Sequence, residues 1–158
     1  MQVRRVLVVE DDHFQREAIT EAIKEAAPRD LRIDVTPANS ETAASNALDA
    51  AERAGTMFDA FVIDLHLPWS QEDSFPTPSE DVVRDGPLVA GFRIADRITN
   101  TRAGQKRPGN NSVPLIVIYT IDDGPDVMAF EDKSKRRYGL VKGDDDKDLA
   151  GLLIRLLD

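Results

Sequence analysis

Runs of β-branched and other apolar residues alternate with helix-forming segments along the whole chain. Repeated strand–helix units of this kind predict a parallel sheet with helices on both of its faces. The expected strands are apolar on both sides of the pleat, as a sheet covered on both faces requires. They occupy residues 3–9, 31–35, 58–64, 115–119 and 140–142. The pattern therefore predicts a single α/β domain.

Segments with helical spacing follow these strands. The first runs from Phe14 to Ala26, with Asp12 as its N-cap and Pro28 as its stop. The apolar stripe of this helix comprises Phe14, Ala18, Ile19, Ala22, Ile23 and Ala26. Further helices are expected over 40–54, over 88–98, within 124–137 and over 148–157.

Two stretches lack any period and are expected to be loops. The first covers about 66–85 and is rich in proline and acidic residues. We interpret it as a solvated insertion near the functional edge of the sheet, with a partner-docking or lid role as the alternative. The second covers about 101–113 and is rich in Gly, Pro and Asn.

Composition narrows the class of protein. A length of 158 residues fits one domain. The chain has 29 acidic against 20 basic residues, a formal charge of −9, which argues against nucleic acid or an anionic membrane as a partner. The absence of cysteine is compatible with a reducing compartment. No apolar run is long enough to span a membrane, and the N-terminal residues do not have the pattern of a signal peptide. We expect a cytoplasmic protein.

Polar side chains stand where four of the expected strands end. Ligands of open α/β sheets bind outside the carboxyl ends of the strands, so these positions are the candidate site. The residues are Glu10 and Asp11 after the first strand, Asp64 after the third, Thr120 after the fourth and Lys142 after the fifth.

Three carboxylates at one edge repel each other by roughly 3 kcal/mol per pair, for a separation of about 5 Å and an effective dielectric of about 20. A divalent cation such as Mg²⁺, which prefers oxygen ligands, offsets this repulsion. Lys142 adds an ammonium and Thr120 a hydroxyl, and such a set suits phosphoryl transfer. An aspartate in it can act as the nucleophile and form an acyl phosphate.

Four segments resemble the receiver domains of response regulators. Val-Leu-Val-Val-Glu-Asp-Asp at 6–12 resembles their first strand, and Phe-Asp-Ala-Phe-Val-Ile-Asp-Leu-His-Leu-Pro at 58–68 their phosphoacceptor strand. Leu-Ile-Val-Ile-Tyr-Thr at 115–120 is similar to the family's strand that ends in a hydroxyl residue involved in switching. Leu-Val-Lys at 140–142 is similar to the family's strand that ends in a lysine at the site. The likeness spans residues 1–158 and implies a doubly wound (βα)5, flavodoxin-like domain with strand order 2-1-3-4-5.

The resemblance also implies roles for individual residues. Asp64 is the phosphoacceptor, and Thr120 and Lys142 contact the phosphoryl group. Asp11, Asp64 and the backbone carbonyl of His66 ligate Mg²⁺, or alternatively Mn²⁺, while Glu10 acts through a metal-bound water.

The same resemblance implies a signalling role. The phosphodonor is a sensor histidine kinase or a histidine phosphotransfer protein, and no external substrate is turned over. Phosphorylation then shifts a conformational equilibrium through Thr120, and the face of the fourth helix and fifth strand serves a homodimer or a downstream protein. With no output domain in the sequence, the chain is a stand-alone receiver or a fragment of a longer regulator.

The sequence departs from the family pattern at several positions. The usual switch aromatic is replaced by Gly139, with Tyr138 one place earlier, so either the strand bulges or Tyr138 is ordinary packing. Gly143 replaces the usual proline after the lysine. Ile121 stands where a small residue is usual, and it either narrows access to Asp64 or packs at the strand end. Positions such as those of His66 and Asp122 tune phosphoryl lifetime in the family.

These departures motivate a second hypothesis, a degenerate receiver that binds partners without phosphorylation. A phosphatase of the haloacid-dehalogenase type is a third hypothesis. Such enzymes require a second aspartate two residues after the nucleophile, and His66 occupies that position here. A basic cluster in an otherwise acidic chain is weak support for a nucleic-acid partner. It comprises Lys133, Lys135, Arg136 and Arg137.

Overall fold

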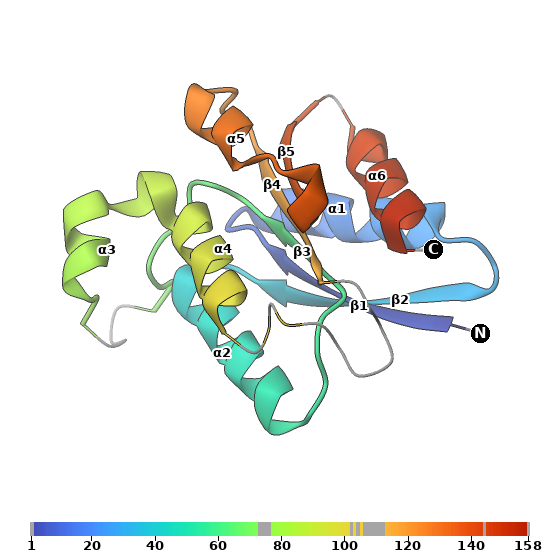
Figure 1. Cartoon of the computed structure of the whole chain (residues 1–158), viewed down its shortest axis with the longest axis horizontal. Coiled ribbons are helices and arrows are strands. Elements are labelled where there is room, and N and C mark those ends of the chain that lie inside the picture. The colour runs from blue at the N-terminus through green and yellow to red at the C-terminus, as the bar shows by residue number, and fades with distance from the viewer. Residues whose placement is uncertain are drawn as a thin grey trace.

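Five parallel strands form one sheet in the order β2-β1-β3-β4-β5 in the computed structural model of this chain (Figure 1). The structure describes residues 2–72, 77–101, 103, 105, 113–143 and 145–157. This sheet confirms the predicted doubly wound α/β fold and its strand order. The strands are β1 (Gln2–Val9), β2 (Leu31–Ala38), β3 (Ala60–Ile63), β4 (Leu115–Thr120) and β5 (Arg137–Val141).

Helices cover both faces of the sheet, and each face has its own apolar core. One core lies under α1 (His13–Ala26) and α6 (Lys147–Leu157). The other lies under α2 (Glu41–Arg53), α4 (Ala90–Asn100) and α5 (Pro125–Phe130). Short helices complete the described chain, namely α3 (Glu80–Asp85) and the 3-10 turns η1 (Pro87–Val89) and η3 (Lys133–Lys135). None of the helices in these described segments combines the length and the apolar character needed to cross a bilayer.

The helix ends follow from local side-chain chemistry. Asp12 caps α1 by accepting a hydrogen bond from the Gln15 backbone N–H at 2.8 Å, as predicted. Ser40 caps α2 in the same way, and Gly55 with a φ of +64° follows its end. The apolar stripe expected on α1 is only partly buried. Phe14 is 81% exposed, because the first turn of α1 stands at the edge of the sheet, past the end of β1.

Three expected segments differ in the structure. The prediction of a loop over 66–85 is wrong at its C-terminal end, because Glu80–Asp85 form α3 and the side chain of Val82 is buried. Six residues are too few to show a helical period in the sequence. Residues 73–76 and most of the second expected loop, 101–113, lie outside the described residues. The helix within 124–137 is limited to α5, and β5 begins at Arg137 rather than Leu140.

Both ends of the 66–85 insertion are tied to the helices beside it. The carbonyls of Pro68 and Trp69 accept hydrogen bonds from the first two backbone N–H groups of α2, at 3.0 and 2.9 Å. Arg93 of α4 makes a two-pronged ion pair with Glu41, at 2.9 and 2.8 Å, and donates to the Gly86 carbonyl at 2.8 Å. The insertion is therefore anchored to α2 and α4 at its two ends.

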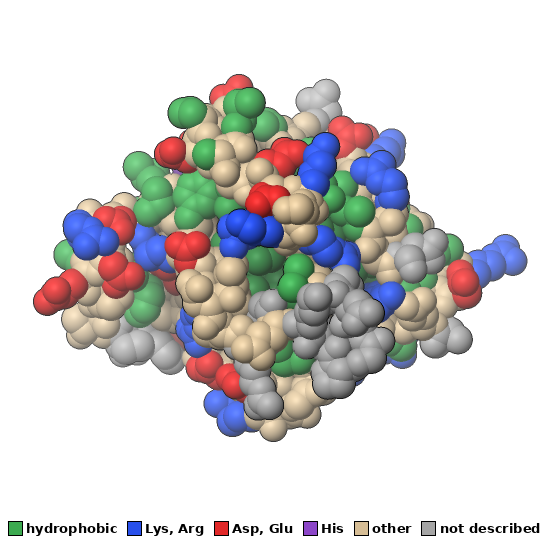
Figure 2. Space-filling view, viewed as in Figure 1, with side chains coloured by type: hydrophobic (Ala, Val, Ile, Leu, Met, Phe, Trp, Pro, Cys, Tyr) green, Lys and Arg blue, Asp and Glu red, His purple; other side chains and the backbone are tan. Residues whose placement is uncertain are grey.

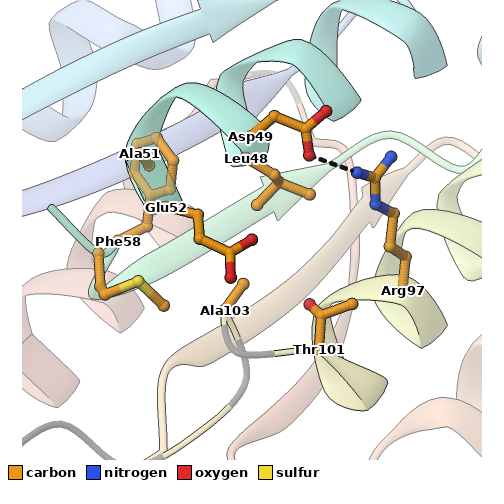
Figure 3. A pocket seen from close by; sticks show the side chains of 9 residues that line it. Leu48, Asp49, Ala51, Glu52, Phe58, Arg97, Thr101 and Ala103 are labelled. Carbon is orange, nitrogen blue, oxygen red and sulfur yellow. Dashed lines mark hydrogen bonds and ion pairs between the residues drawn. The ribbon is translucent and has the colours of Figure 1, made fainter. Parts of the chain in front are cut away.

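A small pocket lies between α2 and the end of α4 (Figure 3). Its volume is about 30 Å³, which suits water better than an organic ligand. Arg97 and Asp49 form an ion pair of 2.8 Å at its rim. We assign this pocket no function, since it lies away from the strand ends that carry the candidate site.

Gly91 allows α4 to approach the strand that carries Asp64. The Gly91 N–H donates to the Leu65 carbonyl at 3.0 Å. A Cβ at Gly91 would overlap the Asp64 carbonyl oxygen and come within 2.8 Å of the Leu65 Cα. These are backbone atoms, so a larger residue forces the helix and strand apart.

Replacing Gly91 should therefore destabilise the fold. We expect Gly91→Ala to lower the free energy of unfolding by about 1–3 kcal/mol, because it overpacks a backbone contact. Gly151→Ala is the matched control on α6, where a Cβ meets nothing within 4 Å, and it should stabilise by about 0.5–1 kcal/mol. Urea denaturation measures both. Equal effects of the two substitutions would contradict the close approach.

Candidate functional site

Three carboxylates meet at the carboxyl edge of the sheet. Val9 of β1 lies beside Ile63 of β3, so the residues that follow them leave the sheet side by side. Glu10, Asp11 and Asp64 each offer an oxygen within 4.8 Å of the others. Glu10 and Asp64 are buried, whereas Asp11 is exposed. The arrangement suits a hard cation with carboxylate ligands, and the exposed Asp11 leaves it open to solvent.

Lys142 joins this cluster from the far side of β4. Its ammonium donates to Glu10 Oε2 at 2.5 Å and to Asp64 Oδ2 at 3.0 Å. The backbone N–H of Lys142 donates to the Thr120 carbonyl at 2.8 Å, which holds the end of β5 against β4. Lys142 therefore connects two of the three carboxylates by charge-assisted hydrogen bonds.

Burial and charge perturb both partners of this contact. Burial raises the pKa of Glu10 to about 7, although its hydrogen bond to Lys142 opposes the shift. Burial alone lowers the pKa of Lys142, but its hydrogen bonds to Glu10 and Asp64 outweigh this, and the pKa lies above its usual value. One ammonium faces three carboxylates here, so a cation or a proton is still needed to balance the charge.

Thr120 ends β4 next to this cluster. The side chain is fully buried, and its hydroxyl oxygen accepts a hydrogen bond of 3.4 Å from the Asp122 N–H. Alternation along β4 places Thr120 on the face of Ile116 and Ile118, which is the face covered by α5. The hydroxyl therefore lies on the α5 side of the sheet, two residues past Ile118, which pairs with Ile63 of β3.

The neighbouring residues form the rim of the site. His66 donates its backbone N–H to Asp64 Oδ1 at 3.4 Å, and its ring Nε2 lies 3.9 Å from Asp122 Oδ2. Ile121 is 74% exposed, so its packing at the strand end, one of the two interpretations, is wrong. His66 therefore lies between Asp64, through its backbone, and Asp122, through its ring.

Tyr138 lies on the opposite face of the sheet from Thr120. The pairing of β5 with β4 runs without a bulge, with Tyr138 opposite Val117 and Gly139 opposite Ile118. Tyr138 packs against the core under α1 and α6. The bulge that would have turned it toward Thr120 is absent, and its position matches ordinary packing.

Gly139 leaves no room for the missing aromatic. A Cβ there would come within 2.7 Å of Val127 Cγ1 and 2.9 Å of the Val127 carbonyl oxygen. Helix α5 therefore packs directly on the backbone of β5 at this position. The space that a side chain would fill is occupied by the helix.

The structure adds two buried polar residues that sequence reasoning did not single out. The Tyr119 hydroxyl donates to Asp146 Oδ1 at 2.7 Å, and Asp146 also accepts from Gln15 Nε2 at 3.2 Å. Asp146 sits within a run of acids that reads as a solvated turn. A phenol inside an otherwise aliphatic strand was the only signal available.

A wider groove opens beside the carboxylates. It has a volume of about 420 Å³ and is lined by Asp11 and by residues at both ends of the 66–85 insertion. Asp11 and His66 line one end, and Trp69, Val82 and Leu88 line the apolar part. The described ends of the insertion thus line a groove that reaches Asp11 and His66.

No protein-family model and no curated protein matches the chain. Solved structures do match it. A two-component response regulator from Cytophaga hutchinsonii aligns with a TM-score of 0.66 at 18% identity, over 99% of this chain and 98% of that one.

Two further structures carry descriptions of their bound or modified state. The phosphorylated cyanobacterial phytochrome response regulator RcpA aligns with a TM-score of 0.58 at 17% identity, over 97% of this chain and 90% of that one. The Mn²⁺-bound form of the response regulator Rcp1 aligns with a TM-score of 0.55 at 18% identity, over 97% and 91% of the two chains. Taken with the strand order, these alignments show that the chain has the fold of response-regulator receiver domains.

Proposed function

We propose that the chain is a phosphoacceptor signalling domain whose Asp64 receives a phosphoryl group in a Mg²⁺-dependent reaction. The single observation that carries the proposal is the contact of Lys142 with Asp64, within a cluster that also holds Glu10 and Asp11. A reactive carboxylate, a cation site and a fixed ammonium in one place are the parts that phosphoryl transfer needs. The receiver fold and the Mn²⁺-bound and phosphorylated structures that share it support the same reading.

The residues present fit a hard divalent cation. Asp11, Asp64 and the His66 carbonyl would hold Mg²⁺ or Mn²⁺, with Glu10 acting through a bound water. When bound, the cation neutralises charge on the phosphoryl oxygens. The donor set consists of oxygens alone, which favours these ions over softer metals.

The chain's own residues then carry the transfer. An Asp64 carboxylate oxygen attacks phosphorus, and a new P–O bond forms as the P–N bond to the donor imidazole breaks. The electron pair of the broken bond returns to the imidazole nitrogen. Lys142 exchanges part of its contact with Asp64 for a phosphoryl oxygen, and the Thr120 hydroxyl donates to another.

The phosphodonor in this proposal is a sensor histidine kinase or a histidine phosphotransfer protein of the cytoplasm. The new charge shifts a two-state equilibrium through Thr120 toward the face of α5 and β5, where a second copy or a downstream protein binds. No external substrate is turned over. Acidic and basic side chains are interspersed on the face shown in Figure 2, which gives nucleic acid no broad basic surface there.

A second candidate is a receiver that signals without phosphorylation. The observation in its favour is Gly139, where α5 occupies the place of a switch aromatic. Loss of the aromatic alone would affect the output of a receiver and leave its phosphorylation intact. The second candidate further requires that Asp64 takes up no phosphoryl group, so labelling of Asp64 separates the two.

Incubation with Mg²⁺ and a small phosphodonor such as phosphoramidate should give one phosphoryl adduct on wild-type protein, seen as intact mass. Asp64→Asn should remove the adduct, because the amide is not a nucleophile, and chelation of the metal should prevent it. Asp122→Asn is the matched control at the same edge and should still be labelled. Labelling that survives Asp64→Asn, or no labelling of wild type, would falsify the phosphoacceptor proposal.

Mg²⁺ affinity should rise with pH through about 7. Because the pKa of Glu10 is raised in the folded protein, its protonation stabilises the metal-free fold. This stabilisation is fully present below about pH 4.5 and is lost as the pH rises through about 7. The cation competes with that proton, so below pH 7 the affinity should change by up to about tenfold per pH unit. Isothermal titration calorimetry at several pH values measures this dependence. Glu10→Gln should flatten it, and a steep dependence that persists in Glu10→Gln would exclude Glu10 as the source.

Phe14 should contribute to docking of a protein phosphodonor. Phe14, in the first turn of α1 that follows Glu10 and Asp11, and Ile121, which directly follows Thr120, are exposed large apolar side chains. We expect Phe14→Ala to slow transfer from a phosphorylated histidine phosphotransfer protein by at least about fivefold, while phosphoramidate labels it at the wild-type rate. Val3→Ala, exposed at the other end of β1, is the control. Equal slowing with both donors would place Phe14 in the chemistry instead of the interface.

A further inference from the structure

A phenol and a carboxylate form a buried pair one residue before Thr120 and four residues after Lys142. Tyr119 is 2% and Asp146 8% exposed, and the Tyr119 hydroxyl donates to Asp146 Oδ1 at 2.7 Å. Asp146 Oδ1 also accepts from Gln15 Nε2 at 3.2 Å. A buried carboxylate that accepts two hydrogen bonds fixes its donors firmly, because leaving either bond unmade is costly in the interior.

The pair ties together the segments that carry the site. Tyr119 precedes Thr120 on β4. Asp146 directly precedes α6, and its carbonyl accepts the first hydrogen bond of that helix from the Ala150 N–H at 2.9 Å. It lies four positions after Lys142. Gln15 belongs to the first turn of α1, which follows Glu10 and Asp11. One carboxylate therefore links the ends of β4, β5 and β1 at the edge where the site lies.

Tyr119 also touches Lys142 directly. The ammonium lies 5.8 Å from the centre of the Tyr119 ring, within the range of a cation–π contact. Burial and the hydrogen bond to the Asp146 carboxylate raise the pKa of the Tyr119 phenol and keep it protonated. The ring is thus held at its hydroxyl end by Asp146, the residue that directly precedes α6.

We propose that Tyr119 and Asp146 are positioning residues that hold the Lys142 ammonium against Asp64. This inference rests on the proposed function of Asp64 and adds a restraint that the strand ends alone do not provide. Gly143 follows Lys142 and has the widest conformational freedom of any residue. The phenol–carboxylate pair restrains this connection from inside the sheet.

The test compares Tyr119→Phe with Tyr138→Phe, the same substitution on the neighbouring strand and in the same apolar core. We expect Tyr119→Phe to slow labelling by phosphoramidate about tenfold, with the Mg²⁺ dissociation constant changed by less than about twofold, because Lys142 is not a metal ligand. Tyr138→Phe should label at the wild-type rate. Asp146→Asn, which keeps an acceptor oxygen, should slow labelling less than Tyr119→Phe.

A double-mutant cycle separates positioning from general loss of stability. In a Lys142→Ala background, Tyr119→Phe should have no further effect on the labelling rate, whereas its effect on thermal stability should remain. A full additional slowing in that background would overturn the inference. So would equal slowing by Tyr138→Phe, or a wild-type rate in Tyr119→Phe.

A crystal structure of Tyr119→Phe tests the positioning independently of phosphorylation. The expected result is a Lys142 ammonium beyond hydrogen-bond distance of Asp64 Oδ2, compared with 3.0 Å here. An ammonium that keeps this contact would overturn the inference. If wild-type protein takes up no phosphoryl group, the proposed function fails, and the position of Lys142 in the variant still decides whether Tyr119 holds it.

Discussion

Repulsion among carboxylates at one edge of the sheet is the constraint on which the site depends. Glu10, Asp11 and Asp64 converge because parallel strands end together, and the charge of each carboxylate is destabilised by the charges of the other two. Lys142 relieves part of this repulsion by bonding to two of the three. The remaining excess of negative charge makes this edge a place that could hold a cation. A fold that buries charge in this way is stable enough only because both apolar cores under it are intact.

Much of the fold and of the site follows from periodicity and strand ends. The parallel sheet could be expected because apolar runs separated by amphipathic segments have few ways to pack, whereas the order of its strands was implied by the resemblance to receiver domains. The convergence of Glu10, Asp64 and Lys142 could also be expected, since residues that end parallel strands share one edge whatever lies between them in sequence. The parallel sheet and the convergence of strand-end residues depend on the alternation of strands with helices and on the common direction of the strands, and both can be predicted from the sequence.

Features that depend on tertiary contact could not be read in this way. The six residues of α3 are helical because Val82 finds a buried place under them, and so short a segment has no period to detect. The side of Tyr138 depends on whether β5 bulges, and that is decided by its pairing with β4. The partner of Asp146 is a tyrosine distant in sequence, so nothing local distinguishes this aspartate from its solvated neighbours.

Alternation along β4 separates two tasks at the site. Tyr119 belongs to the core under α1 and α6, and from there its ring meets Lys142. Thr120, the next residue, faces the side covered by α5. In the proposed function a change at Asp64 would reach α5 through Thr120, on the face opposite to the Tyr119 ring that contacts Lys142. The close packing of α5 on Gly139 means that any such movement must involve the helix and the strand backbone together, because no side chain lies between them.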